Sequence, residues 1–342
     1  MQPPAAIPFQ KLIDALLDTE TPLNPRYLYR LSDLEGSELE LLRAAWPKIP
    51  AWRRQALLED ATELNESDTL LSFESLGRFA VQDEDTKVRL LAVHILWEFE
   101  EASLIPVFMR LLAKDHDSEV RAAAASALGR FIYAGELDEI PQATQQSIEE
   151  ALLGVVNGND APEVRRSALE SLGYSSRDEV PPLVEQAFAS DDKHWKASAL
   201  FAMGRSTNQQ WRPTVLEMLQ SNLPLLRSEA ARAAGELEIS DAVPYLLELL
   251  DDPDDNTRQA SIWSLSQIGG EGVRDTLQTL YEDTDDEQEL ELLESALDNL
   301  TFNEGLQLIP MFDFPEADED EEDWYEEYDL EEIDDILDGE EE

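Results

Sequence analysis

The chain has 342 residues, no cysteine, and 76 acidic against 25 basic residues, which gives a formal net charge of −51. The lack of cysteine excludes disulfides, thiolate metal sites and a cysteine nucleophile on this chain. So negative a chain repels phosphate backbones, and direct nucleic-acid binding is not expected. No stretch approaches the roughly 20 apolar residues of a membrane helix, and the start lacks a signal-peptide pattern. We therefore expect a soluble cytoplasmic protein without membrane contact.

Residues 1–66 carry apolar side chains at helical spacing, are punctuated by prolines, and fit no repeat well. The end of a repeat array must cover an apolar face that would otherwise be exposed. These residues are therefore predicted to form an N-terminal helical cap.

From residue 67 a signature returns six times, in the form Val-Arg-x-x-Ala-x-x-x-Leu-Gly or a close variant. Its basic residues follow one another at steps of 32, 44, 31, 31 and 31 residues. They are Arg89, Arg121, Arg165, Lys196, Arg227 and Arg258. A fixed period of this size is typical of a solenoid. The pattern predicts an all-α fold, a right-handed α-solenoid of about seven helical-hairpin repeats over residues 67–300.

Proline and glycine mark the ends of the helices in each unit. Prolines suited to the first turn of a helix precede the signatures at Pro106, Pro181, Pro213 and Pro244. Glycines that suit a left-handed turn at a helix end follow them at Gly129, Gly173, Gly204 and Gly235. Each unit is therefore predicted to be a helix, a tight turn and a second helix.

An aspartate stands four or five residues before most of the basic positions. These aspartates are Asp85, Asp117, Asp160, Asp192 and Asp254. An aspartate in such a turn can cap the second helix and face the basic residue of its own or a neighbouring unit. We interpret the Asp and Arg/Lys positions as a structural ladder and not as catalytic residues.

The repeat is irregular at two places. The step of 44 residues adds about a dozen residues within 131–147, which predicts a longer helix end and a projecting loop. Near the end, residues 287–300 form an acidic, Leu-rich segment in which Leu290 replaces the basic residue. That segment is predicted to be a C-terminal cap helix.

The alternation of a Pro-led helix with an Asp…Val-Arg-x-x-Ala-x-x-x-Leu-Gly helix resembles the HEAT-like repeats of the phycobilin-lyase type, over roughly residues 70–300. The resemblance implies the fold but does not imply one function, because such repeats occur in bilin lyases, metal-dependent hydroxylases, DNA-repair proteins and scaffolds. The deoxyhypusine-hydroxylase relatives hold two irons with paired His-Glu dipeptides. Here His94, His116 and His194 are followed by Ile95, Asp117 and Trp195. Neither a metal nor another cofactor is therefore expected.

No catalytic constellation accompanies the repeat. A glycine-rich phosphate loop, a Gly-x-Ser-x-Gly motif and zinc-ligand spacing are all missing from the sequence. We therefore predict a protein that is not an enzyme and has no catalytic residues.

One column of the second helices changes completely between repeats, whereas the core columns barely change. It lies six residues after the Val position and reads His94, Ser126, Glu170, Phe201, Arg232 and Trp263. Second helices usually line the concave side of such solenoids, and exposed aromatic residues are enriched in interfaces. The column is therefore a candidate partner-binding site, the alternative being unconstrained solvent positions.

Residues 301–342 form a tail of different character, predicted to be flexible. Within 313–342 there are 19 acidic and no basic residues. Apolar side chains interrupt the acid at Trp324, Tyr325, Tyr328, Leu330, Ile333, Ile336 and Leu337. Such a segment can fold as a short amphipathic helix on a basic partner, the alternative being an inert solvated tail.

The sequence favours a non-enzymatic scaffold or adaptor that binds a protein on its concave helix face. The acidic tail would contact a basic partner or block the groove. Two alternatives remain open, a bilin- or cofactor-lyase-like HEAT-repeat protein and an acidic mimic of nucleic acid.

Overall fold

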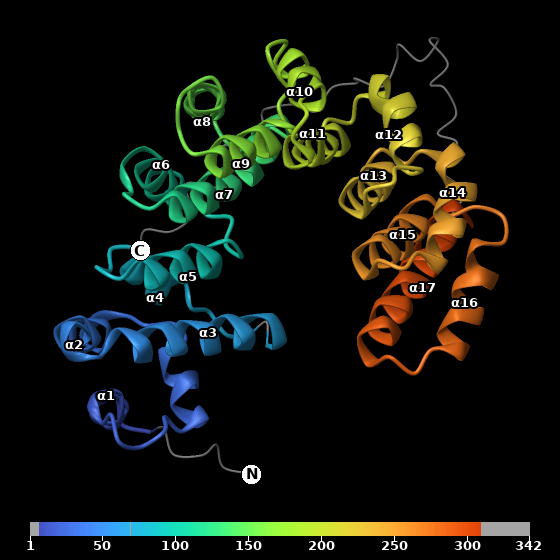
Figure 1. Cartoon of the computed structure of the whole chain (residues 1–342). Coiled ribbons are helices and arrows are strands. Elements are labelled where there is room, and N and C mark those ends of the chain that lie inside the picture. The colour runs from blue at the N-terminus through green and yellow to red at the C-terminus, as the bar shows by residue number, and fades with distance from the viewer. Residues whose placement is uncertain (1–6, 69, 309–342) are drawn as a thin grey trace, which may run out of the picture.

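The computed structural model describes residues 7–68 and 70–308, and all regular secondary structure in these residues is helical. The helices follow one another in a two-layered arc, an α-solenoid, with the N-terminal helices at one end and the last helices at the other (Figure 1). The side chains of residues 66, 67 and 304–308 are not part of the description.

The N-terminal part is built from short helices and one long one. These are α1 (Phe9–Leu17), η1 (Pro25–Leu31), α2 (Gly36–Ala45), η2 (Trp46–Lys48) and α3 (Ala51–Ser67). Helix α3 packs against α5 as the later inner helices pack against one another. The solenoid's inner layer therefore begins at α3, within the segment predicted to be a cap.

The first helices of the hairpins make the outer layer of the arc. They are α4 (Glu74–Ala80), α6 (Ile105–Lys114), α8 (Gln142–Val156), α10 (Val180–Phe188), α12 (Arg212–Met218), α14 (Val243–Glu248) and α16 (Val273–Asp283). Short 3-10 turns adjoin several of them: η3 (Ala102–Leu104), η4 (Gln209–Trp211), η5 (Ser240–Ala242) and η6 (Leu249–Asp251). The predicted helix-opening prolines are confirmed, because all four lie in the first turn of their helix.

The second helices make the inner layer and line the concave side (Figure 1). They are α5 (Thr86–Leu96), α7 (Ser118–Glu136), α9 (Pro162–Leu172), α11 (Lys193–Arg205), α13 (Pro224–Glu236), α15 (Asp255–Ile268) and α17 (Glu287–Leu308). Each contacts its hairpin partner and the next inner helix. The arrangement confirms an all-helical solenoid.

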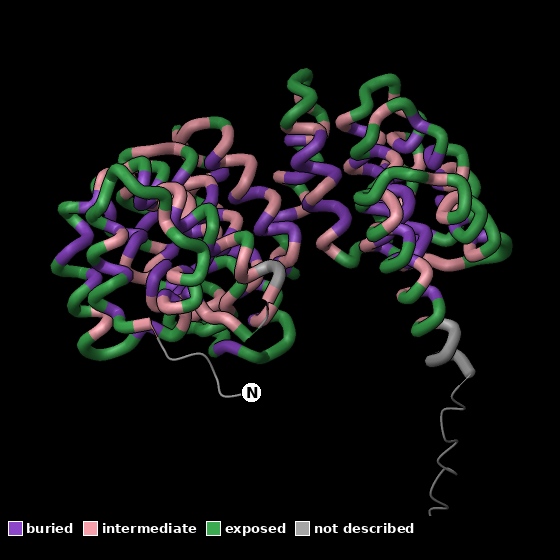
Figure 2. The backbone as a smooth tube through the Cα atoms, turned by 90° about the horizontal axis from the view of Figure 1, so that it is seen from below, coloured by how far each residue is buried: buried purple, intermediate pink, exposed green. Residues whose placement is uncertain are grey.

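The core runs through the whole array between the two layers (Figure 2). The signature alanines Ala92, Ala124, Ala168, Ala199 and Ala230 are fully buried in it. A methyl group fills little space, so neighbouring inner helices approach closely at these positions. The apolar side chains of the outer helices, such as Phe108 and Leu246, close the core from the other side.

The glycines at the ends of the signatures have a role different from the one predicted. Gly173 has a right-handed φ of −52°, and Gly129, Gly204 and Gly235 lie inside helices, so none provides a left-handed turn. A Cβ on Gly173 would lie 2.8 Å from the Cα and carbonyl oxygen of Ala202. The prediction of left-handed caps is wrong, because these glycines let successive inner helices touch.

The extra residues between Arg121 and Arg165 lengthen helices and do not form a projecting loop. Helix α7 continues to Glu136 and has 19 residues, and α8 has 15 residues. Only residues 137–141 connect them. The predicted longer helix end is confirmed and the predicted projecting loop is wrong, since the insertion is absorbed by two extended helices.

Gly173→Ala should destabilise the protein by about 2 kcal/mol, because its new methyl group meets backbone atoms that cannot move aside. The matched control is Gly154→Ala in α8, where a Cβ meets nothing within 4 Å. That substitution should stabilise the protein by about 0.5–1 kcal/mol through helix propensity. Urea unfolding of both variants checks the pair, and equal effects would contradict the close-approach explanation.

Candidate functional site

The ladder aspartates cap the inner helices at four of the five predicted positions. Asp85 accepts a hydrogen bond from Val88 N at 3.0 Å, and Asp254 accepts one from Thr257 N at 3.0 Å. Asp117 and Asp192 cap α7 and α11 in the same way. Asp160 differs, because Ala161 is the N-cap residue of α9 and makes no side-chain cap.

The basic residues bind acids of the following turn, and these are not the capping aspartates. Arg89 binds Asp115 with two hydrogen bonds of 2.8 Å, and Arg227 binds Asp252 at 2.7 and 2.8 Å. Arg121 binds Asp160 at 3.1 and 2.6 Å. The sequence therefore indicated the ladder but named the wrong carboxylate in two of these three turns.

Each of these arginines also donates to the turn that precedes its own helix. Arg89 Nη1 reaches Asp83 O at 3.0 Å, and Arg227 Nη1 reaches Ser221 O at 2.8 Å. One guanidinium thus ties two consecutive turns together. The ladder also begins earlier than predicted, because Arg54 of α3 binds Asp83 at 2.9 Å.

The ladder is interrupted at Arg165 and Lys196, which make no ion pair within the described residues. Arg165 donates to Val156 O at 3.0 Å and lies over the Trp195 ring at 5.3 Å. Lys196 lies over the Phe188 ring at 5.3 Å. Arg258 pairs with Asp255 of its own helix at 2.9 Å and with Glu289 of α17 at 3.8 Å.

Arg227→Gln should lower the free energy of unfolding by about 2 kcal/mol at pH 7, a value between those of exposed and buried ion pairs. Arg165→Gln, which breaks no ion pair, should cost at most about 1 kcal/mol. The hydrogen bonds from Arg227 lower the pKa of Asp252, so their contribution is present at neutral pH and is lost as the pH falls through that depressed pKa. Urea unfolding between pH 7 and 3 checks this, and equal losses for the two variants would refute it.

The variable column of the inner helices is less exposed than predicted. Arg232 is exposed, whereas His94, Glu170, Phe201 and Trp263 are half-buried. Trp263 packs across Gly235 of the preceding inner helix. His94 stacks on Trp97 at 5.7 Å between ring centroids, and burial lowers its pKa. The column therefore combines packing between repeats with access to the concave surface.

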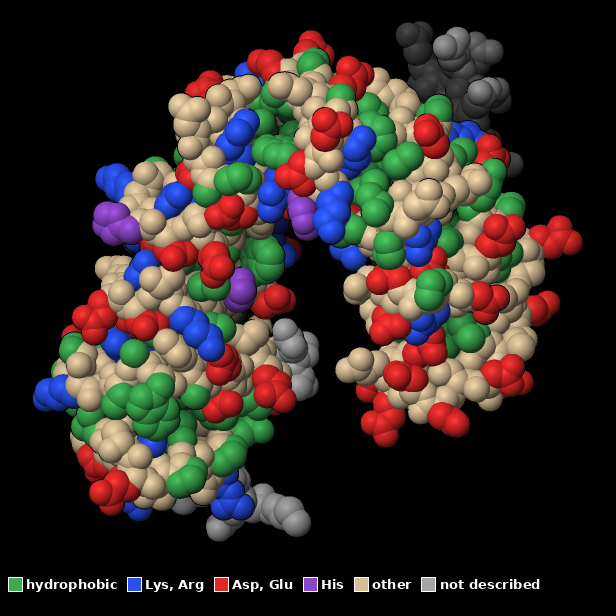
Figure 3. Space-filling model, viewed as in Figure 1, with side chains coloured by type: hydrophobic (Ala, Val, Ile, Leu, Met, Phe, Trp, Pro, Cys, Tyr) green, Lys and Arg blue, Asp and Glu red, His purple; other side chains and the backbone are tan. Residues whose placement is uncertain are grey.

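Charged and aromatic side chains of α9, α11 and α13 gather around one arginine on this inner layer. Arg205 lies over the Phe201 ring at 4.0 Å and over the Tyr174 ring at 4.6 Å. The carboxylates around it come from Glu170, Glu229 and Glu236. We call this group, together with the exposed Arg232, the inner-face cluster. In Figure 3, basic and acidic side chains lie among hydrophobic ones at the hollowed inner margin of the arc.

The inner-face cluster is poorly solvated and incompletely hydrogen-bonded. Burial raises the pKa of all three carboxyl groups and lowers the pKa of Arg205. Glu170 accepts a hydrogen bond of 2.5 Å from Ser198 Oγ. In contrast, Glu229 Oε2 and Arg205 Nε are buried and have no hydrogen-bond partner among the described residues. Buried groups of this kind reduce stability unless something else satisfies them.

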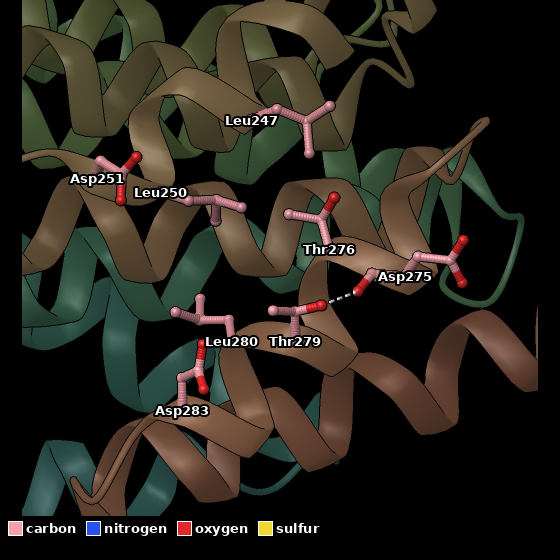
Figure 4. Close-up of a pocket in the computed structure, with 8 residues that line it drawn as sticks. All are labelled: Leu247, Leu250, Asp251, Asp275, Thr276, Thr279, Leu280 and Asp283. Carbon is pink, nitrogen blue, oxygen red and sulfur yellow. Dashed lines mark hydrogen bonds between the residues drawn. The ribbon is translucent and has the colours of Figure 1, made fainter.

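Other features of the described residues give little chemistry. A hollow of about 410 Å³ lies between α14, η6 and α16, on the outer layer (Figure 4). Three aspartates, Asp251, Asp275 and Asp283, line it without a basic residue. No three His, Cys, Asp or Glu side chains in the described part of the chain are placed to hold a metal ion. Among the same residues no helix is long and apolar enough to cross a membrane.

The predicted tail motif cannot be placed. Its residues, Trp324 to Leu337, lie outside the described residues. The role of the tail therefore stays a prediction.

Glu229→Gln should raise the melting temperature at pH 7 by a few degrees, because it removes a desolvated negative charge. Because burial raises the folded-state pKa of Glu229, its negative charge lowers the stability of the protein above that pKa. This destabilisation disappears below the unfolded-state pKa of about 4.3. The gain should therefore vanish near pH 4. Glu217→Gln, at an exposed outer-layer position, is the control. A lower melting temperature for Glu229→Gln at pH 7 would show that Arg205 and Arg232 compensate the charge.

The family model for HEAT repeats matches residues 73–146 and 212–298. These segments are HEAT repeats, and the chain is a HEAT-like repeat protein. The residues between the two matches include α9 and α11 of the inner-face cluster. No match was found among curated proteins.

Several solved structures of low sequence identity are similar to this chain. The CpcE and CpcF complex of phycocyanin lyase from Nostoc sp. PCC7120 is 20% identical, with a TM-score of 0.42, over 66% of this chain and 94% of the other. Human deoxyhypusine hydroxylase is 18% identical, with a TM-score of 0.34, over 86% and 96%. Importin beta is 14% identical, with a TM-score of 0.40, over 86% of this chain and 47% of its own.

Proposed function

We propose that the chain is a non-catalytic scaffold that binds a protein on its concave face, through the inner-face cluster. The observation that carries the proposal is the state of Arg205 and Glu229. Arg205 lies over two aromatic rings, and Arg205 and Glu229 each keep a buried polar atom that has no hydrogen-bond partner in the described part of the chain. On folding, each of these two atoms loses its hydrogen bond to water and gains none from the described residues. This loss costs free energy. A partner can reach the exposed Arg232 and the half-buried side chains of Arg205 and Glu229, and a small shift of these side chains on binding would let it satisfy the two buried atoms.

The chemistry of the cluster also defines the partner. Arginine and aromatic side chains in a desolvated setting are the residue types that dominate interface energies. The three carboxylates and the net charge of −51 favour a partner with a basic surface. The acidic tail, outside the described residues, is proposed to add attraction for the same partner. The lyase-like and nucleic-acid-mimic alternatives stay predictions from the sequence.

Site-specific photo-crosslinking tests the concave face directly. A photo-reactive amino acid replaces Arg232, which is exposed on the inner layer, or Glu217, which is exposed on the outer layer. In native lysate the probe at position 232 should yield an adduct with a discrete protein, and the probe at 217 should not. Adding Phe201→Ala should reduce the adduct about tenfold, since an interface aromatic is worth more than about 1.4 kcal/mol.

The melting temperature of the Phe201→Ala variant must be measured as a control, because Phe201 is half-buried. The adduct should also weaken as salt is raised, because charges contribute to the attraction. Equal adducts from positions 232 and 217, or an adduct indifferent to Phe201→Ala in a folded protein, would contradict the proposal.

A further inference from the structure

The interruption of the ladder can be compared with intact turns of the same chain. In the intact turns of Asp83, Asp115 and Asp252, the acid that binds the preceding arginine also accepts a hydrogen bond from the backbone N–H two residues later. Asp117 N donates to Asp115 Oδ1 at 3.0 Å, and Asp254 N donates to Asp252 Oδ1 at 2.9 Å. One oxygen thus shapes the turn while the carboxylate as a whole binds the arginine of the previous repeat.

Two consecutive turns keep this hydrogen bond but have no carboxylate at the position that binds the preceding arginine or lysine. Asp192 N donates to Ser190 Oγ at 3.1 Å, and Leu223 N donates to Ser221 Oγ at 3.3 Å. Each serine therefore stands where the other turns have an aspartate. Its hydroxyl shapes the turn but cannot neutralise the cation of the preceding repeat. We call Arg165, Ser190, Lys196 and Ser221 the ladder gap.

A hollow of about 330 Å³ lies at the first half of the ladder gap. Arg165, Ser190, Trp195, Asn157, Gln186 and Leu183 are among the residues that line it. Trp195 holds the guanidinium by its face, and Val156 O takes the Nε hydrogen. The terminal nitrogens of Arg165 make no hydrogen bond to the described residues. Guanidinium groups recognise carboxylates through paired hydrogen bonds, as Arg89 and Arg227 do in this chain.

We propose that the ladder gap binds carboxylates of this chain's own acidic C-terminal segment, residues 313–342. One carboxylate takes the place of the missing ladder aspartate at Arg165, and another pairs with Lys196 one repeat further on. The contact would tie the segment to the turn edge of the solenoid, between α9 and α13. This inference goes beyond the proposed function and does not depend on it.

Charge and tethering select this occupant over a separate acidic protein. The segment has 19 acidic and no basic residues. Without these 19 acidic residues the net charge of −51 becomes −32, and the chain repels any acidic ligand, but a tethered segment keeps an effective concentration in the millimolar range, which a separate acidic protein lacks. The 34 residues after Leu308 can extend to on the order of 100 Å.

The test uses the full chain with a photo-reactive amino acid at Gln186, an exposed residue of the hollow. The matched control carries the probe at Glu248, an exposed residue four positions before Asp252 just as Gln186 is four positions before Ser190. Mass spectrometry of a mixture of isotope-labelled and unlabelled protein distinguishes crosslinks within one molecule from those between copies. We expect crosslinks from 186 to residues 313–342 of the same molecule, and at least fivefold fewer from 248.

Ser190→Asp supplies the missing ladder carboxylate from within the fold and is the decisive variant. It should pair with Arg165, raise the melting temperature, and reduce the crosslink from 186 at least fivefold. Ser190→Asn, which keeps an oxygen acceptor for the turn hydrogen bond but adds no charge, should reduce the crosslink much less. A crosslink unaffected by Ser190→Asp in a protein whose melting temperature has risen would overturn the proposal. So would crosslinks only between copies, only to another protein, or to no protein segment at all. Because the probe lies at the turn edge, these outcomes are independent of adduct formation at position 232.

Discussion

Direct contact between successive inner helices is the constraint on which the rest of the structure depends. At Gly173 the backbone of α11 comes so close that no side chain fits, and at Gly204 and Gly235 the next inner helix is nearly as close. Buried alanines extend these contacts along each helix. Because the inner helices approach more closely than the larger outer side chains permit in their own layer, the array curves towards the inner layer. The curvature then brings the charged and aromatic residues of α9, α11 and α13 onto one concave surface.

The repeat and the solenoid could be predicted from the sequence because they depend on periodic signals. The basic residue, the helix-opening proline and the small core residues recur at nearly fixed spacing, and each has a local physical cause. The glycines were misassigned because a glycine near the end of a helical pattern can mean either a left-handed turn or a close neighbour. Only the position of Ala202 against Gly173 decides between these meanings.

The candidate site could be predicted only in part, for a related reason. The variable column did include Glu170, Phe201 and Arg232, because variation between repeats is visible in one chain. It missed Arg205, Glu229 and Tyr174, which meet only after three repeats are stacked. The ladder showed the same limit. In a turn such as Asp115-His116-Asp117 both acids are plausible partners for an arginine, and the curvature decides which one each arginine reaches.

The serines of the ladder gap have a mechanical consequence as well as an electrostatic one. Each intact guanidinium joins two consecutive turns along one edge of the array, and two adjacent joints, after Arg165 and after Lys196, lack that cross-tie. An array stabilised by nearest-neighbour contacts bends and opens first at its weakest interface. The two joints of the ladder gap therefore lack a tie that the joints on either side have, through Arg121 and Arg227, and the inner-face cluster spans these two joints. Bending at these joints would change the spacing of α9, α11 and α13, and with it the shape of the inner-face cluster.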